Sequence, residues 1–339
     1  MTNYGFITVA AAVPRTRVAD VQYNVEEIER LIEEAEGKGV ELLVFPELCI
    51  TGYTCQDLFR SSHLLDASDE ALSILTDFSL GRGITFVVGA PHRQDDRLMN
   101  TAVIISNGQR HYVHKTFLPN YNEFYEKRWF SVEDLDAEPR IFRLPSGVTF
   151  GVEICEDLWS AIPPSTTLAT SGADIILNLS ATDELIGKHK YLLSLISQQS
   201  ARTMSGYVYS SCGFGESSQD LVYAGNAIIY ENGQQLAHSE RFSLEPQLVM
   251  AQIDVERLRT ERRTNTTFGR AQGKLMKKAE VLDLVLDDEA YNKVLGKFTL
   301  HRHYDAHPFI PKTDDMKASC EEIFNIQVLG LARRLEHIR

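Results

Sequence analysis

The chain has 339 residues, a formal net charge of −13 and a hydrophobic fraction of 43%. This length and composition favour a large globular α/β unit with one sizeable core. The acidic balance excludes a broad nucleic-acid-binding face, since phosphate backbones repel such a surface. The start of the chain lacks a signal-peptide pattern, and no apolar run reaches the roughly 18 residues that span a bilayer, so we expect no membrane partner.

The cysteines and histidines indicate the redox environment of the protein and whether it binds a metal. The five cysteines are Cys49, Cys55, Cys155, Cys212 and Cys320. They are too widely spaced for the disulfide framework of a small secreted protein, which predicts a reducing cytoplasm. A histidine-rich stretch at 301–307 has no cysteine nearby, so we expect no metal site.

The first third of the chain alternates strands and helices. The predicted elements are a strand at 6–13, a helix at 24–37 with Asn24 as its N-cap, a strand at 41–47, a helix at 68–80 and a strand at 84–89. Short, uninterrupted apolar strands of this kind are typical of sheets that helices cover.

Hairpins interrupt this alternation twice. Asn107-Gly108 and Asn232-Gly233 each separate two strand-like runs, as in a type I′ turn. Between them we expect a strand ending at Cys155, a helix at 165–171, a strand at 173–180, a helix at 188–204 and a strand at 206–211. Antiparallel pairs next to parallel ones predict mixed sheets.

Three regions follow from this pattern. Residues 1–255 form the predicted α/β domain, and 256–318 is a charged, irregular extension that wraps the domain or links it to another. Residues 319–339 have the spacing of a helix with an apolar face. We expect this helix to be the start of a further domain.

One cysteine stands where a strand runs out. Apolar and small or polar residues alternate along 150–155, which predicts that Cys155 shares a strand face with Glu153. The acids Glu153, Glu156 and Asp157 should raise the pKa of this thiol, so a cation from elsewhere is needed to activate it. The alternative is a half-buried core cysteine.

Glu47 and Lys115 also lie near predicted strand ends. Sites in open α/β sheets gather at the carboxyl ends of strands, so these residues could meet Cys155. Glu47 would then be a general base for the thiol, and Lys115 would lower the thiol pKa and stabilise an oxyanion. Alternatively, Glu47 is a turn cap and Lys115 a solvated strand end.

Taken together, the three residues resemble the site of the nitrilase superfamily of carbon-nitrogen hydrolases. The motifs that carry the resemblance are Phe45-Pro46-Glu47, Lys115 ahead of Leu118-Pro119-Asn120-Tyr121, and Ile154-Cys155-Glu156-Asp157. The resemblance implies an α-β-β-α sandwich with mixed sheets, here with a C-terminal extension. It also implies a second acid after the lysine, for which Glu123 is predicted, holding Lys115 charged and oriented.

Further motifs resemble the glutaminase domains of glutamine-dependent NAD synthetases. They are Thr51-Gly52-Tyr53, the run 215–222 and the run 320–327. The resemblance implies hydrolysis of L-glutamine through a thioester on Cys155, with no cofactor for that step. It also implies a synthetase domain as partner, which uses ATP and Mg²⁺. We expect a homo-oligomer for a different reason, because the apolar hairpins and the C-terminal helix could serve as contact surfaces. The Ser-Gly-Gly-x-Asp-Ser loop of such a domain does not occur in this sequence.

Substrate-binding residues are predicted from the same resemblance. Tyr121, Phe124 and Glu156 should lie near the site, together with Thr182 and Lys188. For the last two, a polar strand-to-helix connection is an equal alternative. Two other functions stay open: a free-standing amidase or carbamoylase with the same chemistry, and a docking module without turnover.

Overall fold

The computed structural model of the protein describes residues 3–132, 138–274, 278–307, 310 and 316–338. Two compact units are distinguished, Met1–Thr299 and Leu300–Arg339. The first unit contains both sheets and the candidate site, whereas the described part of the second contains a single long helix.

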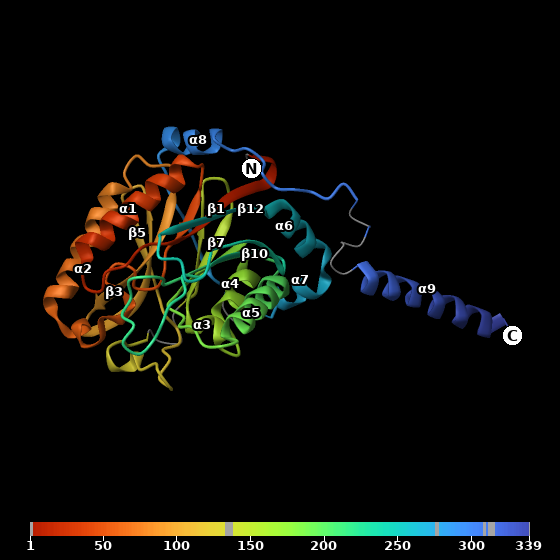
Figure 1. Ribbon diagram of the computed structural model, residues 1–339. Coiled ribbons are helices and arrows are strands. Elements are labelled where there is room, and N and C mark those ends of the chain that lie inside the picture. Colours follow the sequence, from red (N-terminus) through yellow and green to blue (C-terminus); the bar gives the residue numbers. More distant parts are fainter. Residues whose placement is uncertain (1–2, 133–137, 275–277, 308–309, 311–315, 339) are drawn as a thin grey trace. The chain divides into compact units, whose positions relative to one another are not determined.

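Two mixed sheets form the centre of the first unit (Figure 1). The first has the order β12 (Gln247–Asp254), β1 (Phe6–Val13), β2 (Leu42–Val44), β3 (Thr85–Gln94), β4 (Arg97–Ser106) and β5 (Gln109–His114). The second has the order β11 (Gln234–His238), β10 (Ala227–Glu231), β9 (Gly206–Ser211), β8 (Ile175–Ser180), β7 (Thr149–Ile154), β6 (Arg140–Arg143) and β13 (Glu280–Asp283). The triplets β1-β2-β3 and β7-β8-β9 are parallel, and antiparallel strands flank them.

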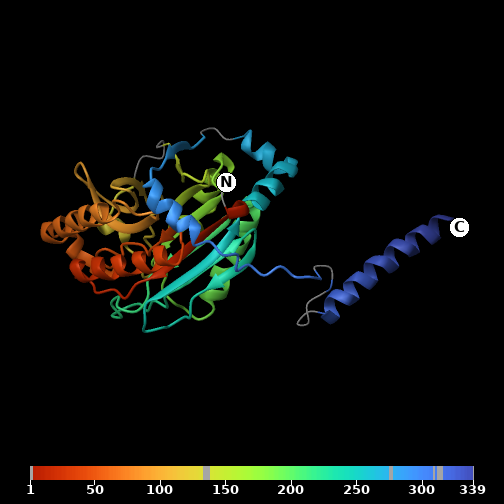
Figure 2. The same ribbon diagram turned by 90° about the horizontal axis from the view of Figure 1, so that it is seen from above.

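Helices cover the outer faces of this sandwich (Figures 1 and 2). The helices of the first unit are α1 (Val21–Gly37), α2 (Ser62–Phe78), α3 (Glu156–Trp159), α4 (Pro164–Ser171), α5 (Lys188–Thr203), α6 (Val255–Thr264), α7 (Thr266–Gln272) and α8 (Asp288–Gly296). Among the described residues, the 3₁₀ segments that accompany them are η1 (Asn3–Gly5), η2 (Tyr53–Arg60) and η3 (Glu126–Arg128). The predicted α-β-β-α sandwich with mixed sheets is confirmed.

The strands alternate between two apolar cores, as their period of two requires. On β1, for example, Val9 and Ala11 face the second sheet, whereas Ala10 and Ala12 pack under the helices of the first sheet. The core between the sheets also takes side chains from β7, β8 and β9. Every strand of the parallel triplets is therefore covered on both faces, which explains their unbroken apolar runs.

Both predicted hairpins are confirmed, because Asn107, Gly108, Asn232 and Gly233 all have positive φ, as a type I′ turn requires. The predicted N-cap of the first helix is wrong. Asp20 caps α1 by accepting from the Tyr23 N–H, one turn before the predicted start.

The region predicted to be irregular is largely regular up to residue 299. It contains α6, α7, β13 and α8. The periodicity of α6 is weak because only Val255 and Leu258 are buried, while its arginines hold it to the domain. Arg259 pairs with Asp174 at 2.6 Å, and Arg262 donates to backbone carbonyls that include that of Met204. Contacts of the charged arginines thus hold α6 in place of the apolar face that a helical sequence pattern would reveal.

The second unit contains α9 (Met316–Ile338), as the apolar spacing predicted. Its large apolar side chains are exposed: Ile323, Phe324, Ile326, Val328, Leu329, Leu331, Leu335 and Ile338. Within the described residues, no helix combines the length and apolar character needed to cross a membrane.

Glu41 gives the fold a pH-dependent contact. It is buried just before β2 and accepts a 2.8 Å hydrogen bond from Tyr291 of α8. Burial raises the pKa of Glu41 from 4.5 to about 7. Between these pH values the folded state keeps a proton that the unfolded state releases, so this contribution to stability is lost as pH rises through the window.

We therefore expect wild type to lose about 1–3 kcal/mol more unfolding free energy than Glu41→Gln between pH 5 and pH 8. Urea denaturation at the two pH values measures the difference, with the exposed Glu70→Gln change on α2 as the control. Equal pH dependence in wild type and Glu41→Gln would contradict this account.

Candidate active site

Glu47 follows β2 and is fully buried. Its chain segment passes so close to β3 that a Cβ on Gly89 would lie 2.2 Å from the Leu48 nitrogen and 2.8 Å from the Glu47 carbonyl carbon. Only glycine allows this approach. Leu48 itself has a φ of 50°, which turns the chain sharply after Glu47. The backbone of β3 therefore helps to place the Glu47 carboxylate.

Cys155 stands at the turn between β7 and α3. Its φ of 47° and ψ of −98° lie outside the strand region, and its N–H donates to the Leu179 carbonyl at 2.9 Å. This turn moves Cys155 to the core between the sheets, while Glu153 faces the other way and binds Tyr207. The prediction that Cys155 and Glu153 share a face is wrong, because the strand ends one residue earlier than the alternation suggested.

Lys115 follows β5 and extends into the interior, where its side chain has no exposed surface. Its Nζ lies 2.6 Å from Glu47 Oε1 and 2.7 and 2.9 Å from the two carboxylate oxygens of Glu126. Two carboxylates from different segments thus hold one buried ammonium. The predicted meeting of Glu47 with Lys115 is present in the structure.

The second acid at this lysine is Glu126, three residues beyond the predicted Glu123. The chain turns between Tyr121 and Phe124, and η3 then directs the buried Glu126 inward, with its N–H donating to the Pro119 carbonyl. Glu123 is only partly buried and lines the pocket in front of this cluster. A residue count after a lysine cannot detect the direction of such a turn.

Two further side chains complete the cluster and were not predicted. Asn100 of β4 donates to Glu47 Oε1 at 2.6 Å, and the Tyr53 hydroxyl donates to Glu126 Oε1 at 2.8 Å. In the part of the chain that the structure describes, the buried Glu47 Oε2 has no hydrogen-bond partner. This oxygen is therefore available to accept a proton.

The electrostatics of the cluster favour a charged lysine and a protonated thiol. Burial opposes the charge of Lys115, but the carboxylates of Glu126 and Glu47 outweigh it and raise the lysine pKa. Burial raises the pKa of Cys155, Glu47 raises it further, and Lys115 acts in the opposite direction. The predicted effect of Lys115 on the thiol pKa is present, whereas the carboxylates that raise this pKa are Glu47 and Glu126 rather than the acids beside Cys155.

Asp157 has a different task from the one predicted. Its Oδ1 accepts from the N–H groups of Thr116 and Phe117 at 3.1 and 2.8 Å, and its Oδ2 accepts from the Ile154 N–H at 2.9 Å. The carboxylate thereby ties the segment after Lys115 to the turn at Cys155. The sequence does not reveal this role of Asp157, because a carboxylate that accepts from backbone N–H groups has no characteristic residue pattern.

Contacts link the predicted substrate-binding residues to one another and to Cys155. Tyr121 donates to both oxygens of Glu156 at 2.8 and 2.9 Å, and Thr182 Oγ1 lies 3.9 Å from Cys155 Sγ. Lys188 Nζ lies 5.5 Å from the Phe124 ring centroid and pairs with Asp183. All five therefore connect, directly or through one another, to the turn at Cys155 or to its flank.

The comparisons with known proteins agree with this geometry. The sequence model of the carbon-nitrogen hydrolases matches residues 8–263. The chain belongs to the carbon-nitrogen hydrolase family. Its predicted membership of this family, with relatives among glutamine-dependent NAD synthetases, is confirmed.

Two curated relatives of this carbon-nitrogen hydrolase are named glutamine-dependent NAD(+) synthetase. They come from Mycobacterium tuberculosis and Mycobacterium leprae, are 36% and 34% identical to it, and match 98% of this chain. The chain spans about half of their length, 51% in each case.

Solved structures show the same relationship. A glutamine-dependent NAD(+) synthetase from Cytophaga hutchinsonii superposes with a TM-score of 0.66 at 28% identity, over 73% of this chain and 43% of that one. An amidase of the nitrilase superfamily from Nesterenkonia shares the fold, with a TM-score of 0.65 at 20% identity over 78% of this chain and 99% of its own.

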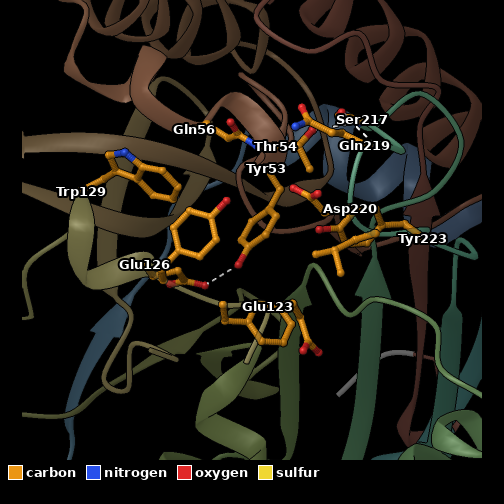
Figure 3. A pocket seen from close by; sticks show the side chains of 13 residues that line it. Tyr53, Thr54, Gln56, Glu123, Glu126, Trp129, Ser217, Gln219, Asp220 and Tyr223 are labelled. Atoms are coloured by element: carbon orange, nitrogen blue, oxygen red, sulfur yellow. Dashed lines mark hydrogen bonds between the residues drawn. The ribbon is translucent and has the colours of Figure 1, made fainter. Parts of the chain in front are cut away.

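A pocket lies beside the cluster of this carbon-nitrogen hydrolase (Figure 3). Its lining residues are Tyr53, Thr54, Gln56, Glu123, Phe124, Tyr125, Glu126, Trp129, Ser217, Gln219, Asp220, Leu221 and Tyr223. Figure 3 shows Tyr53 directing its hydroxyl at Glu126. The pocket thus adjoins the carboxylate that holds Lys115.

Gly89→Ala tests the placement of Glu47. The added methyl group would meet backbone atoms of residues 46–48, so we expect a loss of about 1–3 kcal/mol in unfolding free energy. A displaced Glu47 should also slow turnover by about a hundredfold. Gly37→Ala, at an open position at the end of α1, is the matched control and should leave both quantities nearly unchanged. Wild-type turnover in a folded Gly89→Ala protein would refute the placement.

Proposed function

We propose that this chain is the glutaminase part of a glutamine-dependent NAD synthetase. It hydrolyses the side-chain amide of L-glutamine, and the ammonia serves an ATP-dependent synthetase that amidates deamido-NAD. The observation that supports the proposal is the position of Cys155 at a sharp turn, with a thiol pKa that responds to Glu47 and to a lysine held between two buried carboxylates. The mycobacterial relatives supply the support for the choice of glutamine.

In the first half of the reaction, Cys155 Sγ attacks the amide carbon of glutamine. Because burial keeps the thiol protonated, a base must take its proton during the attack. The unpartnered Oε2 of Glu47 is that base, and it passes the proton to the amide nitrogen. The C–N bond then breaks, which releases ammonia and leaves a γ-glutamyl thioester on Cys155.

In the second half, water attacks the thioester carbon. Glu47 removes a proton from the water and returns it to the departing sulfur, which yields glutamate and the free thiol. The same carboxylate therefore acts in both halves, and no cofactor takes part.

Lys115 stabilises the negative oxygen that develops in both halves. Its Nζ lies within hydrogen-bond distance of three oxygens, one of Glu47 and two of Glu126; when the two Glu126 oxygens share one N–H, the third proton is left for the oxyanion. The N–H of Glu156, among the first of α3 and without an intrahelical acceptor, is the second donor. Each such donor is worth about 3 kcal/mol.

The charged ends of glutamine require complementary groups. We assign the α-amino group to Glu156, which Tyr121 orients, and the α-carboxylate to Lys188. Phe124 packs against the aliphatic part, and Thr182 lies beside the reacting sulfur. Asp183 limits the charge that Lys188 presents, since the two already form an ion pair.

The partner of this chain would be the synthetase, with its ATP and Mg²⁺. We propose that α9 packs against it, because the exposed apolar side chains of this helix need a cover and the curated relatives are about twice as long. We also propose a cytoplasmic location, which suits five free cysteines. A homo-oligomer stays a prediction from sequence.

Covalent labelling tests the proposal most simply. We expect a glutamine-mimicking electrophile to modify Cys155 stoichiometrically and to abolish the release of glutamate from glutamine. Peptide mass spectrometry identifies the modified residue. Cys320→Ala, which removes the exposed thiol of α9, should label as wild type does, whereas Cys155→Ala should not label.

Equal labelling of Cys155→Ala and wild type would contradict the assignment of Cys155 as the nucleophile. Labelling by simple amide electrophiles alone, with no reaction toward the glutamine mimic, would instead favour a free-standing amidase. Absence of any reaction at Cys155 in the folded protein would favour a docking module.

A further inference from the structure

Glu216 caps a helix that belongs to a distant part of the chain. Its Oε1 accepts from the Tyr53 N–H at 2.8 Å, and its Oε2 accepts from the Thr54 N–H at 3.0 Å and the Thr54 hydroxyl at 2.6 Å. These N–H groups are the first two of η2, where an intrahelical acceptor is lacking. The Glu216 carboxylate thus acts as the N-cap of η2, a role that a local side chain usually has.

The backbone around Glu216 is fixed independently of this cap. A Cβ on Gly215 would lie 1.8 Å from the Thr16 carbonyl oxygen, and the Thr16 N–H donates to the Phe214 carbonyl at 3.2 Å. The Ser217 N–H also donates to the Thr54 hydroxyl at 2.9 Å. Glu216 therefore brings a firmly held loop to the start of η2.

Tyr53 carries this contact to the active site. Its backbone N–H binds Glu216, while its hydroxyl donates to Glu126 Oε1, the oxygen that lies 2.7 Å from Lys115 Nζ. Three hydrogen bonds in series thus join Glu216 to the lysine. Among the described residues, no hydrogen bond joins Glu216 directly to Lys115 or Glu126, and the series through Tyr53 is a route that reaches the lysine by hydrogen bonds alone.

We propose that Glu216 is a positioning residue for amide hydrolysis: it fixes Tyr53, and Tyr53 holds Glu126 in place against Lys115. The inference rests on the proposed function for the reaction that it concerns, whereas the contacts themselves do not depend on that function. The proposal assigns a role to Glu216, the acid in the run 215–222 that resembles glutamine-dependent NAD synthetases in sequence.

The contacts predict a pH signature. Burial raises the pKa of Glu126 to about 7, whereas the hydrogen bond from Tyr53 lowers it. Among its charged neighbours, Lys115 lowers the pKa of Glu126 and Glu47 raises it. When Tyr53 is lost or displaced, Glu126 should take up a proton at higher pH, and Lys115 should lose one of its two counter-charges there.

The experiment compares Glu216→Ala, Glu216→Gln, Tyr53→Phe and the double variant Glu216→Ala/Tyr53→Phe in the full chain. Two readouts are measured against pH: kcat/KM for glutamine hydrolysis, and the rate at which iodoacetamide alkylates Cys155, followed by peptide mass spectrometry. Ser218→Ala, an exposed change in the same loop, is the control. Thermal unfolding verifies that each variant is folded.

We expect Glu216→Ala and Tyr53→Phe to lower kcat/KM by about 10- to 100-fold and to move the acid-side inflection to higher pH in both readouts. Glu216→Gln, which keeps one acceptor oxygen, should do less. The double variant should be no worse than the worse single variant, because both changes break one series of contacts.

Two results would overturn the proposal. One is an unshifted inflection in Glu216→Ala while Tyr53→Phe shifts it, and the other is additive loss in the double variant. If Glu216→Ala fails to fold, Glu216→Gln carries the same comparison. If wild type alkylates at Cys155 without hydrolysing glutamine, the proposed function fails, while the alkylation profiles still decide the role of Glu216.

Discussion

The site depends on a buried ammonium held between two buried carboxylates. Removing Lys115 from water is costly unless partners of opposite charge replace the lost hydration, and Glu47 and Glu126 provide them at hydrogen-bond distance. One of these partners is also the proposed base. The lysine thus fixes Glu47 Oε1, and among the described residues Oε2 has no hydrogen-bond partner, which orients the proposed base.

The sandwich delivers these groups from separate strands. Glu47 and Lys115 follow β2 and β5 of the first sheet, and Cys155 follows β7 of the second, so packing the two sheets brings the proposed base, the cation and the proposed nucleophile together. Loops and 3₁₀ segments then add Glu126 and Tyr53. A rigid core places the reacting groups, and connecting segments determine how they are held.

The sequence predicted the parts of this arrangement that leave a local pattern. Strand alternation, the two Asn-Gly turns and the strand-end positions of Glu47, Lys115 and Cys155 all have such a pattern, and the structure agrees with them. The contact of Glu126 with Lys115 and the brace by Asp157 depend on how turns direct a side chain. Neither has a signature in residue spacing, which explains why Glu123 was predicted and Glu126 was not.

The charged region after residue 255 illustrates the same limit. Its first helix, α6, is held by Arg259 and Arg262, which bind a carboxylate and backbone carbonyls of other segments. Hydrophobic periodicity cannot reveal contacts of this kind, because their partners are distant in sequence. Family resemblance, in contrast, predicted the carbon-nitrogen hydrolase family correctly, since it compares whole motifs rather than single elements.

The comparison of Glu126→Gln with Glu123→Gln tests the central claim most directly. Both changes remove one carboxylate from the segment after Lys115, but only Glu126 touches the lysine. The account predicts that Glu126→Gln lowers kcat for glutamine hydrolysis by about a hundredfold, whereas Glu123→Gln stays within about threefold of wild type. A folded Glu126→Gln protein with wild-type turnover, or a larger loss in Glu123→Gln, would contradict it.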